Sequence, residues 1–265
     1  MMLPRISIVT LSFNQASFLA AAMESILSQG YPELEYIVVD PGSRDDSRAI
    51  IERYRDRIDR LLLDPDQGPA DGLNKGFATA TGAIFGYINA DDLMLPGSLH
   101  RIAAHFADPV VDAILGQGCI VDRDGRVIRR AGSSRFDLVD FGHGAMTFLQ
   151  QGHYFRRSAF ERTAGFNIEN RTCWDAELLV DMALAGVRPV NVPDSLGAFR
   201  SYAETISGND RLAAQRTRDL ARIKARALGR GPRASDRIVA PLRLMMRRLG
   251  DPAMTLAGLR ARWHG

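Results

Sequence analysis

Apolar residues in the first ninety positions form short continuous runs, separated by longer segments in which they recur at helical spacing. The runs have the length of buried strands, and Gly or Pro ends several of the segments between them. Strands that alternate with helices predict parallel βαβ units and a sheet buried on both faces. The expected strands are residues 6–11, 35–40, 60–64 and 84–89, and the expected helices are residues 16–29, 45–58 and 70–80.

The second half of the chain has a less regular pattern. We expect strands at residues 111–117, 152–156 and 195–202, a hairpin at 119–130, and helices at 158–164 and 175–185. After Gly208 the chain becomes helical and arginine-rich. These patterns predict one α/β unit over residues 1–208, with halves at 1–110 and 111–208, and a basic helical extension over 209–265.

Composition places the chain among ordinary globular proteins. Of its 265 residues, 46% are hydrophobic and 25% are charged. The two cysteines, Cys119 and Cys173, have neither metal-ligand spacing nor the density of a disulfide scaffold, which favours a reducing, cytoplasmic setting. We expect no signal peptide and no transmembrane helix, since no run of 18 apolar residues occurs.

The net charge of +3 conceals an asymmetry along the chain. From Arg211 to Gly265 there are 14 Lys/Arg and three acids, a balance of +11, so the first 210 residues carry 3 − 11 = −8. Residues 242–249 mix leucines, methionines and arginines as an interfacial helix on anionic lipid does. Two interpretations stay open, attachment to a membrane surface or helices packed on the body with arginines in solvent. Nucleic acid is not expected, because the tail lacks interleaved aromatic residues.

The fourth expected strand ends in the most informative segment, Asn89-Ala90-Asp91-Asp92. Ligands of open α/β sheets bind beyond the carboxyl ends of strands, where the loops converge. Adjacent carboxylates there repel each other unless a cation or hydrogen-bond donors offset the charge. Oxygen ligands suit Mg²⁺ or Mn²⁺, and these ions suit a diphosphate. The alternative is a solvated turn in which Asp92 caps the next segment.

Asp40, at the tip of the second strand, can accept a hydrogen bond from a nucleobase N–H or a ribose hydroxyl. Its alternative role is an Asx-turn. The chain has neither a Gly-x-Gly-x-x-Gly segment after its first strand nor a Walker-type loop, so phosphate binding would rely on metal and side chains such as Lys75.

Four short blocks follow one another along the chain, IVTLSFN at 8–14, VVDPGSRD at 38–45, DGLNKG at 71–76 and NADD at 89–92. Together they resemble glycosyltransferase family 2, which has the GT-A fold and uses nucleotide-diphosphate sugars. Each block is weakly specific, but the four in this order are strongly specific, and the resemblance covers residues 5–205. It implies an α/β GT-A fold with a mostly parallel sheet flanked by helices, in which residues 1–110 form the nucleotide-sugar-binding half and residues 111–208 the acceptor-binding half. It also implies a UDP- or dTDP-sugar as favoured donor, and a glycan or lipid-linked acceptor in polysaccharide or cell-envelope biosynthesis.

The resemblance implies a role for each matching position. Leu11, Ser12 and Phe13 would line the base pocket, and Asp40 would bind the base. Asp71 and Lys75 would lie near the donor, with Lys75 facing its phosphates. Asn89-Ala90-Asp91 would stand in the place of the family's Asp-x-Asp motif, with Asp91 binding the metal, and Asp92 would bind donor hydroxyls or cap a helix. Two departures are Asn89 in place of the first aspartate and Pro41 in the Asp-Asp-Gly-Ser motif. Asn89 can still offer a neutral oxygen, so either metal affinity would be weaker or Asn89 would bind ribose instead.

Inverting transfer requires a general base that deprotonates the acceptor hydroxyl. The segment around Asp175 resembles the family's catalytic segment, although Trp174 stands where an acid is common. Glu177 is a second candidate, and the alternative for Asp175 is a helix cap. His143, His153 and Arg200 are weaker candidates for contacts with the acceptor or the phosphates. Two other functions remain open at this point, a sugar nucleotidyltransferase and a non-catalytic nucleotide-sugar-binding protein.

Overall fold

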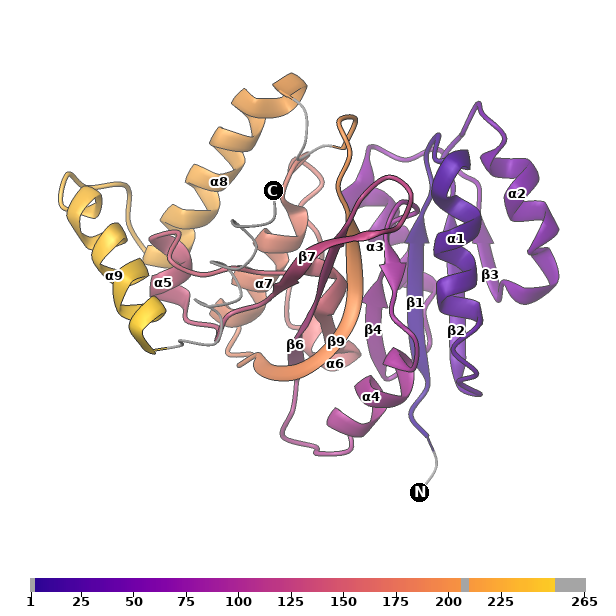
Figure 1. The fold of residues 1–265 in the computed structure, drawn as a ribbon, viewed down its shortest axis with the longest axis horizontal. Helices are drawn as coiled ribbons and strands as arrows, with labels where there is room; N and C mark the ends of the chain where they lie inside the picture. Colours follow the sequence, from indigo (N-terminus) through magenta and orange to yellow (C-terminus); the bar gives the residue numbers. More distant parts are fainter. Residues whose placement is uncertain (1–2, 206–209, 251–265) are drawn as a thin grey trace.

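The structure, a computed structural model, describes residues 3–205 and 210–250, and its core is one nine-stranded sheet (Figure 1). The strand order is β3-β2-β1-β4-β8-β6-β9-β5, and β7 pairs with β6 beside this path. The strands are β1 (Ile6–Leu11), β2 (Leu34–Val39), β3 (Arg60–Leu62), β4 (Ile84–Tyr87), β5 (Leu93–Met94), β6 (Ala113–Val121), β7 (Val127–Gly132), β8 (His153–Arg156) and β9 (Val190–Arg200).

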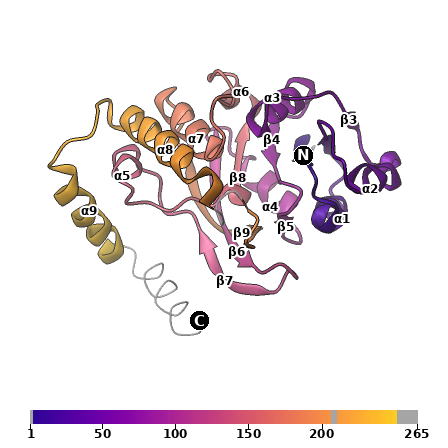
Figure 2. The same cartoon turned by 90° about the horizontal axis from the view of Figure 1, so that it is seen from above.

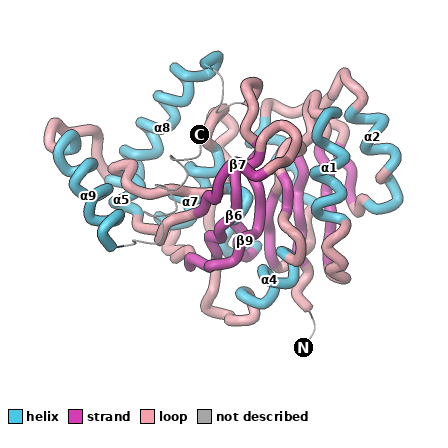
Figure 3. Tube along the Cα trace, viewed as in Figure 1, coloured by secondary structure: helices cyan, strands magenta, loops and turns pink. Residues whose placement is uncertain are grey.

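Helices cover both faces of the sheet, as the continuous apolar strands require (Figure 3). One hydrophobic cluster joins α1, α2 and α4 to the sheet, and a second joins α3, α6 and α7 to its other face. The helices are α1 (Ala16–Leu27), α2 (Ser47–Arg53), α3 (Pro69–Thr79), α4 (Ser98–His105), α5 (Leu138–Gly142), α6 (Arg157–Phe160), α7 (Trp174–Leu184), α8 (Ala213–Leu228) and α9 (Asp236–Gly250). Short 3₁₀ turns lie at Arg55–Arg57, Gln150–Gly152 and Asp210–Leu212.

The first four expected strands pair in parallel, β1 with β2 and β4, and β2 with β3. Beyond β4 the sheet is mixed, because β8 runs antiparallel to both β4 and β6. The expected hairpin forms between β6 and β7. The expected fourth strand ends at Tyr87 rather than Asn89, and the last strand starts at Val190, before its expected start. The sequence patterns did not reveal α4, α5 or the two-residue β5, whose backbone is held by pairing with β9.

The basic helix α8 packs on the α/β body rather than lying apart from it. Ile223 and Ala227 of α8 form a small core with Val180 of α7, flanked by Leu138 and Phe141 of α5. Seen from above, α8 lies over α7, and α9 lies farthest from β1 and α1 (Figure 2). Among residues 3–205 and 210–250, no helix has the length and apolar character needed to cross a bilayer. The division at residue 208 stays a prediction.

Candidate active site

The loops after the parallel strands open into a large cavity of about 1720 Å³. Residues from the first and fourth strand ends line it together with the start of α7, which the sequence places far from both. Of the residues proposed from the sequence, Leu11, Phe13, Asn89, Ala90, Asp91, Asp92 and Asp175 line this cavity. Ser12, Asp40, Asp71 and Lys75 do not belong to its lining.

Asp40 is completely buried at the end of β2, beside the loop that follows β1. Its Oδ1 accepts hydrogen bonds from the N–H groups of Gly42 and Ser43 and from Arg48 Nε. Burial alone would raise the pKa of Asp40, but the hydrogen bonds from Ser43, Gly42 and Arg48 outweigh it and hold the pKa below its usual value. Oδ2 has no hydrogen-bond partner among the described residues, so this ionised carboxylate retains an acceptor for a ligand N–H.

Ser12 lies next to Asp40, because its N–H donates to Val39 O at 2.8 Å. Its Oγ is also buried without a hydrogen-bond partner among the described residues. Phe13, the next residue, is 58% exposed at the cavity rim. A nucleobase could stack on the Phe13 ring and form hydrogen bonds with the two unpartnered atoms, Asp40 Oδ2 and Ser12 Oγ.

The block at residues 71–76 is explained by close packing of α3 on the sheet. A Cβ at Gly72 would lie 2.9 Å from Leu11 Cδ2, and one at Gly76 would lie 2.7 Å from Val9 Cγ1. The two glycines, four residues apart on one helix face, therefore let α3 approach β1. On the exposed side of α3, Lys75 Nζ lies 3.0 Å from Asp71 Oδ2 and donates to Pro65 O. Lys75 faces this loop and not the cavity, in contrast to the phosphate-facing position expected for it.

The carboxylates of Asp91 and Asp92 have different surroundings, although they are adjacent in sequence. Asp92 is 1% exposed, and its oxygens accept hydrogen bonds from Arg200 N at 2.9 Å, Gln151 Nε2 at 2.7 Å and Asn89 Nδ2 at 3.1 Å. Burial and the neighbouring Asp91 raise the pKa of Asp92 to about 8. Asp92 thus joins the end of β4 to β9 and to the Gln150–Gly152 turn, and both its oxygens are already used.

Asp91 keeps one oxygen open to the cavity. Tyr202 donates its hydroxyl to Asp91 Oδ2 at 2.8 Å, and no hydrogen bond to Oδ1 is seen among the described residues. Arg200 is buried, donating through Nε to Asp91 O and through Nη1 to the carbonyls of Asp122 and Arg123. Arg200, a weaker candidate for a phosphate contact, is thus hydrogen-bonded to backbone carbonyls and does not line the cavity. Arg200 and Tyr202 therefore hold the turn at Asp91 in place. The only signal for this role in the sequence is that both residues lie at the end of the last expected strand.

This arrangement fits a divalent cation only if the ligand supplies most of its coordination. No group of three or more His, Cys, Asp or Glu side chains that could hold a metal ion is found in the described part of the chain. Asn89 donates to Asp92 through its amide nitrogen, which leaves its carbonyl oxygen as a neutral ligand beside the one carboxylate oxygen of Asp91. Mg²⁺ commonly binds one or two carboxylates, several waters and substrate phosphates, and one such carboxylate with a diphosphate meets that requirement.

Asp175 lies in the first turn of α7 and faces the same cavity as Asp91. Trp174 and Tyr87, both buried, line the cavity beside it. Burial raises the pKa of Asp175, and the backbone N–H groups at the helix start oppose this only in part. A carboxylate with a raised pKa in a partly apolar pocket is a suitable general base.

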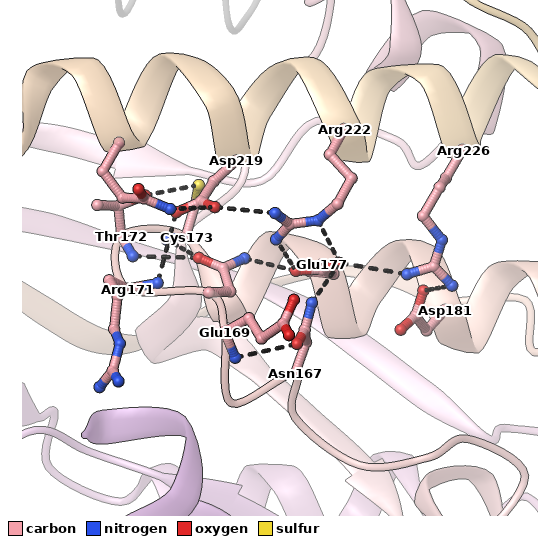
Figure 4. A network of polar contacts seen from close by, with 12 residues as sticks. Asn167, Glu169, Arg171, Thr172, Cys173, Glu177, Asp181, Asp219, Arg222 and Arg226 are labelled. Atoms are coloured by element: carbon pink, nitrogen blue, oxygen red, sulfur yellow. Dashed lines mark hydrogen bonds and ion pairs between the residues drawn. The ribbon is translucent and has the colours of Figure 1, made fainter. Parts of the chain in front are cut away.

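Glu177, the second candidate for the base, is committed to a buried ionic network (Figure 4). It is 1% exposed and contacts Arg222 at 2.8 Å and Arg226 at 3.2 Å, both from α8. Asn167 and Asn170 donate to the same carboxylate at 3.1 and 2.7 Å. It does not line the cavity, so its role is to hold α8 and the loop before α7 in place.

The two histidines considered from the sequence lie outside the cavity lining. His153 is buried in β8, where burial lowers its pKa to about 3, so its imidazole is neutral. The His143 Nδ1 atom lies 3.9 Å from Asp236 at the start of α9. Neither histidine is therefore placed to contact a ligand in the cavity.

The half of the cavity away from Asp91 is built from the second half of the chain, where acceptor contacts were expected. It is lined by β7, by the segment around α5, and by the inner side of α9. Its side chains are a mixture of arginines and apolar groups, which include Arg129, Arg135, Phe136, Phe148, Leu244 and Arg247.

Comparison with known proteins gives consistent family matches. A family model described as Glycosyl transferase family 2 matches residues 7–169. An uncharacterized glycosyltransferase of Nostoc sp. is 32% identical over 130 residues, which are 48% of this chain and 40% of that protein. A GalNAc(5)-diNAcBac-PP-undecaprenol beta-1,3-glucosyltransferase of Campylobacter jejuni is 28% identical over 129 residues, 47% of this chain and 41% of that protein. The chain therefore spans less than half the length of these two relatives.

Two solved structures share the fold. S. aureus TarS 1-349 in complex with UDP-GlcNAc has a TM-score of 0.68 and 17% identity, covering 93% of this chain and 73% of that one. The mannosyltransferase PcManGT from Pyrobaculum calidifontis, in complex with GDP-Man and Mn²⁺, has a TM-score of 0.67 and 22% identity, covering 97% and 76%. These neighbours are GT-A glycosyltransferases, which confirms the fold class expected from the sequence.

Proposed function

The chain belongs to glycosyl transferase family 2, and from this we propose that it is an inverting glycosyltransferase with a nucleotide-diphosphate-sugar donor. The observation that carries the proposal is that one cavity contains both Asp91, with a free carboxylate oxygen, and Asp175, at the start of α7. A donor diphosphate beside Asp91 and an acceptor hydroxyl beside Asp175 would meet in this cavity. UDP- and dTDP-sugars are the donors that we favour, and the UDP-GlcNAc complex of TarS supports the uridine class.

In the proposed reaction, the Asp175 carboxylate takes the proton of an acceptor hydroxyl as that oxygen attacks the anomeric carbon. The bond to the leaving diphosphate breaks on the opposite face, so the anomeric configuration inverts. A divalent cation held by Asp91 and the diphosphate, Mg²⁺ or Mn²⁺, would stabilise the negative charge on the leaving group. Asp40 and Ser12 would bind the base, and Asp92 would act structurally through its three hydrogen bonds.

The acceptor belongs in the far half of the cavity, and we propose a glycan or a lipid-linked glycan. The named acceptor of the Campylobacter relative is a sugar on a diphosphate lipid, which supports the second class. Arginines beside aromatic and aliphatic groups in this half suit an acceptor that has both sugar rings and anionic groups.

The test combines donor binding with turnover in two variants of α7. A panel of nucleotide sugars with Mn²⁺ is expected to raise the melting temperature of the wild type for at least one donor. The variant Asp175→Asn should keep that shift and lose about 10²- to 10⁴-fold in kcat. The control is Asp181→Asn, which changes another aspartate of α7 that pairs with Arg226 outside the cavity lining. Full turnover by Asp175→Asn would exclude Asp175 as the base, and no shift with any donor would count against the whole proposal.

A further inference from the structure

Helix α9 exposes a continuous apolar stripe on the side turned away from the protein. Five large apolar residues form this α9 stripe, and their exposed fractions run from 49% at Leu242 to 75% at Leu249. They occupy positions i, i+4, i+7, i+8 and i+11, which places them on one helix face. The stripe consists of Ile238, Leu242, Met245, Met246 and Leu249.

The opposite side of α9 is fixed to the protein by ion pairs, so the helix cannot roll to bury the stripe. Arg243 Nη1 lies 2.6 Å from Asp140 Oδ1 of α5, and Arg247 contacts the other oxygen of the same carboxylate. At the start of the helix, Arg230 pairs with Asp236 at 2.6 Å. The outward direction of the stripe is therefore determined by tertiary contacts.

The charge around the α9 stripe is strongly positive. Between Gly229 and Gly250 the chain contains six arginines and one aspartate. Asp140 and Asp236 each neutralise part of this charge through the pairs just described. The side chains of Arg233 and Arg237 are exposed and have no carboxylate partner among the described residues. These cations lie at the N-terminal end of the stripe, where they are free to meet a negatively charged surface.

We propose that α9 docks on an anionic lipid surface through this stripe. A single convex helix has no groove for a peptide, whereas its apolar side chains can enter the boundary of lipid head groups and acyl chains while the arginines meet phosphates. Nucleic acid is a poor fit, since the exposed side chains are aliphatic or methionine and offer no ring for base stacking.

Docking in this orientation has a consequence for the acceptor. Leu244 and Arg247, on the inner side of α9, line the far half of the cavity. A membrane beneath the stripe would therefore lie next to the acceptor half of the site. This step rests on the proposed function, and it selects a lipid-linked acceptor over a free glycan.

The test is sedimentation of the full chain with vesicles of phosphatidylcholine alone or mixed with phosphatidylglycerol. Binding is expected for the mixed vesicles, to weaken with added salt, and to fall by at least about tenfold in the double variant Leu242→Glu/Met246→Glu. The matched control compares Leu249→Glu with Val110→Glu, because Val110 is 85% exposed but lies before β6, far along the chain from α9. Only the first of these two should weaken binding.

Several results would overturn the inference. Absence of binding to anionic vesicles would do so, as would equal binding by the wild type and the double variant. Self-association that the same double variant abolishes would assign the stripe to a second copy of the chain. Binding that appeared only after removal of residues 251–265 would mean that the chain's own end occupies it. Donor-induced thermal shifts, measured on the same samples, separate failure of this inference from failure of the proposed function.

Discussion

The variant Glu177→Gln tests how the basic helix α8 holds the helix that carries Asp175. Glu177 accepts hydrogen bonds from Arg222, Arg226, Asn167 and Asn170, and only 1% of its surface is exposed. Glutamine preserves the shape of the side chain but removes its charge. All four neighbours of this side chain are hydrogen-bond donors, so the NH₂ group of the new amide would face another donor and lose at least one hydrogen bond.

The size of the destabilisation expected for Glu177→Gln follows from the solvent exposure of its two arginine partners. Removing one member of a buried ion pair costs about 3–5 kcal/mol when the other charge stays buried. The side chains of Arg222 and Arg226 are 36% and 43% exposed, so water can recover part of their solvation. We therefore expect a loss of about 2–3 kcal/mol in the free energy of unfolding, below the fully buried range.

The assay is urea-induced unfolding at neutral pH, analysed by linear extrapolation. The control is Glu161→Gln, the same substitution in the exposed pair of Arg157 and Glu161, which are 2.6 Å apart. That change should cost less than about 1 kcal/mol, as exposed ion pairs do. If Glu177→Gln were no more destabilising than Glu161→Gln, the network would not hold α8 to α7, and the reasoning would be refuted.

Three further outcomes follow from single side chains. Asp91→Ala should abolish the extra thermal stabilisation that Mn²⁺ gives in the presence of a nucleotide sugar, and a retained metal effect in melting curves would exclude Asp91 as the ligand. Burial lowers the pKa of His153 to about 3, so the folded state binds fewer protons than the unfolded state below pH 6.5. As the pH is lowered from 6.5 towards 3, the free energy of unfolding should therefore fall by about 1.4 kcal/mol per pH unit. His153→Phe should flatten this slope in urea titrations at a series of pH values. A Cβ at Gly118 would overlap the Gly197 carbonyl of β9, so Gly118→Ala should cost about 3 kcal/mol or more, while Gly231→Ala, with no atom within 4 Å, should stay within about 0.5 kcal/mol.

The tertiary structure gives the physical reason for the difference between Asp91 and Asp92, which in the sequence rested on the family resemblance alone. Asp91 and Asp92 are adjacent, yet one keeps an oxygen for a ligand and the other gives both oxygens to internal donors. The donors for Asp92 come from Gln151 and Arg200, which lie 59 and 108 positions further along the chain. No local pattern can show which carboxylate receives such donors, so the two Asp roles were not separable by spacing.

The charge asymmetry also acquired its physical meaning only in the structure. The excess of acids in the body and of arginines in the tail predicted a basic extension, with its arginines in solvent or on lipid. Several of these arginines instead reach buried or half-buried acids of the body, including Glu177, Asp181 and Asp140. The pairs lie 45 to 107 positions apart in the chain, beyond the reach of any helix-spacing rule.

By itself, the sequence determined the parallel half of the sheet, the loops that meet at its edge, and the family. Alternating apolar runs specify βαβ units locally, and the handedness and direction of such units leave little freedom. It also indicated Asp175 as the candidate base through a resemblance rather than through spacing. Only the tertiary structure decided that Glu177 is structural, that Lys75 turns from the cavity, and that the apolar side of α9 faces outward. These outcomes depend on which side chains meet across the fold, because burial and charge pairing are properties of three-dimensional neighbours and not of neighbours in sequence.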